Sequence, residues 1–138
     1  MSFCEINNNL KIDYNTKNYS NTSDPSVWGP AFWFSLHNGA SRYPENPNPL
    51  AQERMKGFIL GIPFILPCPE CAKDAFSFIE KNKPYFNQIC KNKKNLFEFF
   101  CNFHNHVNKK TNKQLLYSQE AFELYTGKAS VKCLQKYN

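Results

Sequence analysis

The chain has 138 residues, of which 41% are hydrophobic and 16% aromatic, and its formal net charge is +6. This length suits one domain with its own core, and the hydrophobic content excludes a chain that is disordered throughout. The positive charge comes almost entirely from lysines in Asn/Lys-rich stretches, which indicates solvated surface, so a nucleic-acid partner ranks last among the possible partners.

Residues 1–24 are polar and rich in asparagine, and they are predicted to form a loose arm ahead of one domain over residues 25–138 that ends in a short polar tail. The N-terminal stretch has no basic start followed by an apolar core, which argues against a signal peptide. The longest apolar run, Phe58 to Leu66, has nine residues, whereas a membrane-spanning helix needs about twenty. No membrane partner is therefore expected.

Apolar periodicity predicts an all-α fold with four longer helices, a short fifth helix and no sheet. The first helix begins near Asp24 or Ser26, which can cap it, and Pro30 suits its first turn. Pro63 is expected to kink the second helix, and the Lys/Asn-rich segment that carries Cys90 is expected to be a loop. The predicted helices cover about residues 24–43, 50–65, 68–81, 95–111 and 118–124.

Two of the six cysteines, Cys68 and Cys71, form a Cys-Pro-Glu-Cys motif directly after the apolar run. They lie where a helix would begin, and the free N–H groups there lower the pKa of a thiol. The spacing lets the two sulfurs bond, so the pair can cycle between dithiol and disulfide. Alternatively the pair is half of a zinc site that Cys101 and His104 complete, because C-x2-C with C-x2-H supplies four tetrahedral ligands. Spacing alone leaves both interpretations open.

Two predicted helices carry a histidine on a face with aromatic residues. His37 lies one turn from Trp33, and His104 lies one turn from another aromatic side chain. Aromatic planes with a few fixed hydrogen-bonding groups suit a flat heteroaromatic ligand. Lys110 and Lys113 follow at a spacing that reaches a pyrophosphate. Together with a redox cysteine pair, these features suggest a dinucleotide.

Three segments, WGPAFWFSLH, LPCPEC and FHNHVNKKTNK, resemble in order and spacing the Erv/ALR family of FAD-linked sulfhydryl oxidases. The likeness covers about residues 28–125, and the Trp-Gly-Pro form of the first segment is most similar to members from large DNA viruses. The resemblance implies a four-helix bundle that cradles FAD, a short fifth helix and a homodimer. It also implies a location in the host cytoplasm or in the virus particle.

The activity that the resemblance implies is the oxidation of thiols in substrate proteins to disulfides. Electrons would pass through the Cys68–Cys71 disulfide to FAD and then to molecular oxygen, giving hydrogen peroxide. Cys68 matches the cysteine that exchanges with substrate, and Cys71 matches the one beside the isoalloxazine ring. The positions that match cofactor-binding residues are Trp28, Gly29, Trp33, His37, Tyr43, Cys71, His104, Asn105, Val107, Asn108, Lys110, Lys113 and Tyr125.

The chain departs from the cellular members of that family at two positions. Pro30 stands where they have an arginine, which puts one phosphate or ring contact in doubt. Cys101 matches one half of their structural bridge, but the partner position is Ser118, so Cys101 is expected to be a buried free thiol. The sequence leaves three roles open for Cys4 and Cys133: they pair with each other, including between subunits, they relay electrons, or they are inert thiols.

Overall fold

The computed structural model describes residues 22–127, so Cys4, Cys133 and nearly all of the predicted arm lie outside the described residues. The described part of the chain is helical and contains no strand, which confirms the all-α prediction. None of its helices is long and apolar enough to span a membrane. The five longer helices are α1 (Pro25–Ala40), α2 (Pro49–Gly61), α3 (Pro69–Asn82), α5 (Lys93–Lys110) and α6 (Ser118–Tyr125).

Short polar side chains begin three of these helices by accepting a hydrogen bond from a free backbone N–H. Asp24 accepts from the N–H of Ser26 at 2.9 Å, which confirms Asp24 as the cap of α1. Asn48 caps α2 and Asn92 caps α5 in the same way. Because α1 begins at Pro25, Pro30 lies inside the helix and not in its first turn.

Two segments differ from the sequence prediction. The second helix does not continue through a kink: α2 ends at Gly61, and a separate 3₁₀ turn, η3 (Ile62–Ile65), contains Pro63. A proline lacks the N–H that an α-helix needs, which accounts for the break. The segment predicted as a loop forms η4 (Lys83–Tyr85) and α4 (Phe86–Ile89), because Phe86 is buried and anchors it.

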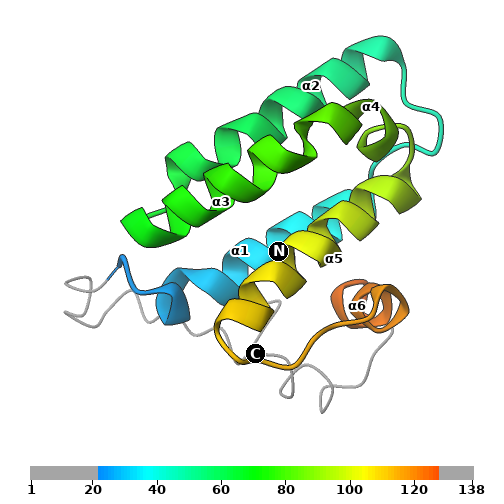
Figure 1. The fold of residues 1–138 in the computed structure, drawn as a ribbon. Helices are drawn as coiled ribbons and strands as arrows, with labels where there is room; N and C mark the ends of the chain where they lie inside the picture. Colours follow the sequence, from blue (N-terminus) through cyan, green and yellow to red (C-terminus); the bar gives the residue numbers. More distant parts are fainter. Residues whose placement is uncertain (1–21, 128–138) are drawn as a thin grey trace.

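Helices α2 and α3 run side by side, as do α1 and α5, and α6 packs against both helices of the second pair (Figure 1). Helix α5 supplies the largest share of the described core: Leu96, Phe99, Phe100 and Phe103 are each at most 3% exposed. Burying each of these side chains contributes roughly 1.5–3 kcal/mol. The packing of α1, α3 and α6 around α5 brings the three segments with redox or ligand-binding character together. A four-helix bundle around a cofactor stays a prediction.

Candidate redox site

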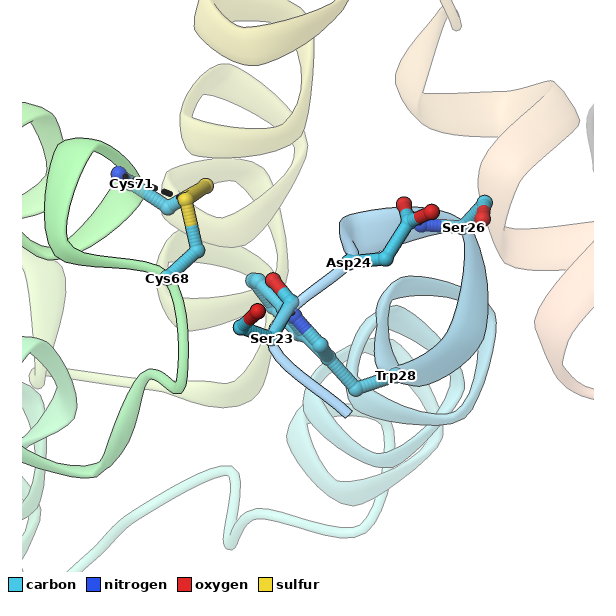
Figure 2. The surroundings of a disulfide bond; sticks show 6 residues. All are labelled: Ser23, Asp24, Ser26, Trp28, Cys68 and Cys71. Atoms are coloured by element: carbon cyan, nitrogen blue, oxygen red, sulfur yellow. Dashed lines mark hydrogen bonds between the residues drawn. A yellow bond between two sulfur atoms is a disulfide. The ribbon is translucent and has the colours of Figure 1, made fainter. Parts of the chain in front are cut away.

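Cys68 and Cys71 form a disulfide at the beginning of α3 (Figure 2). Cys68 is the N-cap of the helix, and its Sγ accepts a hydrogen bond from the N–H of Cys71 at 3.2 Å. The helix N-terminus carries a partial positive charge that favours sulfur as a thiolate once the bond is reduced. Both cysteines are half-buried. The site therefore combines a partly accessible disulfide with a helix start that favours a thiolate.

A cavity of about 390 Å³ opens beside this disulfide. Cys71 lines the cavity, whereas Cys68 is not among its lining residues. The opposite wall comes from the first turns of α1, where Trp28 and Gly29 lie; the indole N–H of Trp28 donates to the Ser23 carbonyl at 3.1 Å (Figure 2). A cavity of this size is in the range of small-ligand sites. The two cysteines thus face different surroundings.

Flat side chains form one wall of the cavity. Trp33 of α1 stacks on His104 of α5 with ring centroids 4.1 Å apart and an interplanar angle of 4°. Phe103 meets the edge of the same indole, and Tyr125 of α6 completes this side. Val107 also lines the cavity. Stacked and edge-to-face rings of this kind offer planes against which a flat heteroaromatic group packs.

His104 and His37 form a buried imidazole pair behind this wall. Nε2 of His37 lies 2.9 Å from Nδ1 of His104. Burial, followed by repulsion from His104, lowers the pKa of His37 to about 3. Burial, followed by the charge of Lys113, lowers the pKa of His104 to about 3. Both imidazoles are therefore neutral at physiological pH.

Charged groups gather where the end of α5 meets α3. Lys110 and Lys113 both line the cavity, as the sequence prediction requires for phosphate contacts. Asp74, which the sequence reading missed, lines it too and pairs with Lys110 and with Nε2 of His106, the latter at 3.1 Å. Asp74 lies three residues after Cys71, so the helical i,i+3 spacing was a signal that could have found it.

The side-chain amide of Asn108 is available to a ligand in the cavity. The residue is 5% exposed and lines the cavity, and no described residue hydrogen-bonds its side-chain amide. No side-chain N or O atom of the described residues is both buried and without a partner, so the amide is open to the cavity.

Three predicted cofactor-binding residues do not line this cavity. His37 is fully buried behind His104. The Tyr43 hydroxyl donates to the Cys90 carbonyl at 2.7 Å, which ties the end of α1 to the end of α4. Asn105 holds the loop between α5 and α6, because its side chain donates to the Leu116 carbonyl and accepts from the Leu116 N–H, at 2.6 and 2.7 Å. Direct contact of these three with a cofactor stays a prediction.

Replacing Asn105 with alanine is expected to lower the free energy of unfolding by roughly 1–3 kcal/mol, because two hydrogen bonds of the half-buried amide are lost. Urea denaturation measures the change. Asn102→Ala on the same helix is the control, since Asn102 is exposed. Equal stability of the two variants would show that Asn105 does not hold the loop.

The structure does not bring the four predicted zinc ligands together in one site. Cys68 and Cys71 bond to each other, and Cys101 faces His37, with Sγ 3.9 Å from Nδ1. The imidazole of His104 contacts His37 and stacks on Trp33. Among residues 22–127 no group of three or more His, Cys, Asp or Glu side chains is placed to hold a metal ion. Cys101 is a buried free thiol, as the serine at position 118 predicts.

The cavity fits the parts of an FAD molecule by chemistry. Its stacked Trp33 and His104 rings suit a flat heterocycle, its Asn108 amide suits a ring edge, and Lys110 and Lys113 suit phosphates. Cys71 of the disulfide also lines the cavity. These residues meet the needs of a redox-active dinucleotide.

Comparison with known proteins indicates the same family as the sequence motifs do. The model of the Erv1/Alr family matches residues 30–126. A protein of Invertebrate iridescent virus 3 named as a putative FAD-linked sulfhydryl oxidase is 41% identical over 102 residues, which cover 74% of this chain and 68% of that protein. An FAD-linked sulfhydryl oxidase of African swine fever virus is 34% identical over 98 residues, covering 71% of this chain and 79% of the relative.

The fold is also similar to a solved structure. A crystal structure of Erv1 from Saccharomyces cerevisiae, solved as a double cysteine-to-serine mutant, superposes with a TM-score of 0.70 at 28% sequence identity. The superposition covers 78% of this chain and 87% of that chain. The order of the helices and their packing are therefore shared over most of both chains.

Proposed function

Because this chain belongs to the Erv1/Alr family, we propose that it is an FAD-linked sulfhydryl oxidase that forms disulfide bonds in substrate proteins. The observation that carries the proposal is the Cys68–Cys71 disulfide at the start of α3, with Cys71 lining a cavity whose walls suit a dinucleotide. The relatives' names agree with a thiol oxidase that uses FAD.

The disulfide supplies the first half of the reaction. A substrate thiolate attacks Sγ of Cys68, the Cys68–Cys71 bond breaks, and Cys71 leaves as a thiolate on the side that lines the cavity. A second substrate thiol then displaces Cys68 from the mixed disulfide. The substrate has now lost two electrons and two protons as it gained a disulfide, and the enzyme pair holds the two electrons as a dithiol.

Residues of the chain hold the reacting groups in place during these steps. The N–H of Cys71 bonds the Cys68 sulfur, and the start of α3 favours negative charge there. Trp33, His104 and Asn108 would hold the FAD ring systems, and Lys110 and Lys113 its phosphates. When bound, FAD would supply the two-electron acceptor that lets the Cys68–Cys71 disulfide re-form, with molecular oxygen as the final acceptor, giving hydrogen peroxide.

Purified protein is expected to be yellow and to oxidise dithiothreitol with one hydrogen peroxide formed per disulfide. Visible absorbance and a peroxide assay measure the two properties. A zinc determination on the same sample tests the alternative, a non-catalytic α-helical binding module held by zinc at Cys68, Cys71, Cys101 and His104. Colourless protein that carries one equivalent of zinc would overturn the oxidase proposal and favour that module.

Association and location complete the proposal. We expect a homodimer, as the resemblance to the family implies. We also expect a location in the host cytoplasm or the virus particle, because relatives of this chain come from large DNA viruses.

A further inference from the structure

A line of buried polar side chains leads from Cys101 on α5 to the cavity. Sγ of Cys101 lies 3.9 Å from Nδ1 of His37. Nε2 of His37 lies 2.9 Å from Nδ1 of His104, and His104 lines the cavity. Cys101, His37 and His104 are 1%, 0% and 5% exposed. The oxidase reaction described above does not use Cys101.

The two imidazoles permit only two arrangements of protons. A neutral imidazole carries one N–H donor and one acceptor nitrogen, so the bond between His37 and His104 has a direction. If Nε2 of His37 donates, then Nδ1 of His37 accepts and Nε2 of His104 carries the remaining N–H. If Nδ1 of His104 donates, both of these outer nitrogens reverse their roles. No described residue hydrogen-bonds Nε2 of His104, so this nitrogen is left to the cavity.

Cys101 decides between the two arrangements. Burial raises the pKa of its thiol to about 12, so the sulfur keeps its proton. Nδ1 of His37 is the described side-chain neighbour of the sulfur that is able to accept the S–H. Sulfur is a weak acceptor, whereas an imidazole nitrogen is a good one. The S–H therefore donates to Nδ1 of His37, and the first arrangement follows.

We propose that Cys101, acting through His37, is a positioning residue that fixes His104 as the Nε2–H tautomer and so presents an N–H donor to the cavity. The group that this donor recognises is a hydrogen-bond acceptor on the ligand, such as a ring nitrogen or a carbonyl oxygen. That the ligand is FAD rests on the proposed function, whereas the tautomer does not.

Long-range ¹H–¹⁵N NMR of the imidazole rings at neutral pH reads the tautomers directly. The chain has three histidines, so in a His106→Gln background the remaining imidazole signals come from His37 and His104. Both are expected to be Nε2–H in the full chain. Cys101→Ala is expected to convert a large share of both to the Nδ1–H form, and Cys101→Ser, which keeps a donor, is expected to restore Nε2–H. Cys90→Ala is the matched control, because Cys90 is also a fully buried free thiol but lies at the end of α4.

Quenching of flavin fluorescence supplies the second readout. Cys101→Ala is expected to weaken FAD binding by roughly three- to tenfold, the effect of one misdirected hydrogen bond, with Cys101→Ser and Cys90→Ala near the unmodified chain. An Nδ1–H form of His104 in the unmodified chain, or tautomers that Cys101→Ala does not change, would overturn the inference. Absence of FAD binding by the unmodified chain would instead overturn the proposed function and leave the tautomer result intact.

Discussion

Replacing Cys71 with serine is expected to abolish the oxidation of dithiothreitol, by more than about 10³-fold, and to leave FAD bound. The substitution removes the sulfur that lines the cavity, so the disulfide with Cys68 cannot form and no electrons reach the cavity. The rings and lysines that would hold FAD are unchanged. Oxygen consumption and visible absorbance of the same sample measure the two outcomes.

Two further variants make this experiment specific. Cys68→Ser is expected to stop turnover as well, because the sulfur that substrate attacks is lost. Cys90→Ala is expected to turn over like the unmodified protein, because Cys90 is a buried thiol outside the cavity lining. Unmodified turnover in Cys71→Ser would contradict the role given to the disulfide. Loss of colour in that variant would show instead that Cys71 is needed to retain the cofactor.

Acid is expected to destabilise the protein well before its carboxylates titrate. The pKa of His37 and of His104 is about 3 in the folded protein and near 6.5 when unfolded. Because the folded value is lowered, the unfolded chain binds more protons as the pH falls through 6.5, and the loss of stability continues until the folded pKa is reached. Above about pH 7 the two histidines are neutral in both states and add no pH dependence.

The expected loss between pH 7 and pH 5 is roughly 2–4 kcal/mol of unfolding free energy, since each histidine contributes up to about 1.4 kcal/mol per pH unit. Urea denaturation at the two pH values measures it. His37→Gln is expected to remove about half of the loss, and His106→Gln is the control, because His106 lies outside the buried imidazole pair. Equal losses in both variants would mean that the buried imidazole pair is not the cause.

The helices could be predicted from the sequence because their signals are local. The apolar spacing along α5 and the caps Asp24, Asn48 and Asn92 act within one or two turns. The helical folding of the Cys90 segment could not be predicted in the same way, because burial of Phe86 against the rest of the molecule outweighs a polar, loop-like composition. The end of α2 has a local cause, since Pro63 lacks the N–H that would continue the helix.

Some of the residues predicted for the candidate site line the cavity, and others do not. The stretch from Trp28 to Trp33 and the end of α5 line the cavity as the resemblance implies. Asn105 and Tyr43 instead make hydrogen bonds within the protein, because a helical face alone does not say whether it meets a cavity or the core. Asp74 was missed, although it follows Cys71 by three residues on the same helix.

The Cys-Pro-Glu-Cys spacing by itself determined that Cys68 and Cys71 are able to bond at a helix start, since two intervening residues bring both sulfurs within one turn. It left open whether Cys101 and His104 join them around zinc. Only the tertiary structure decided that question, because the packing of α1 on α5 turns Cys101 toward His37 and sets His104 against Trp33. Contacts between residues more than sixty positions apart depend on how helices pack against each other. Residue spacing along one helix does not predict that packing.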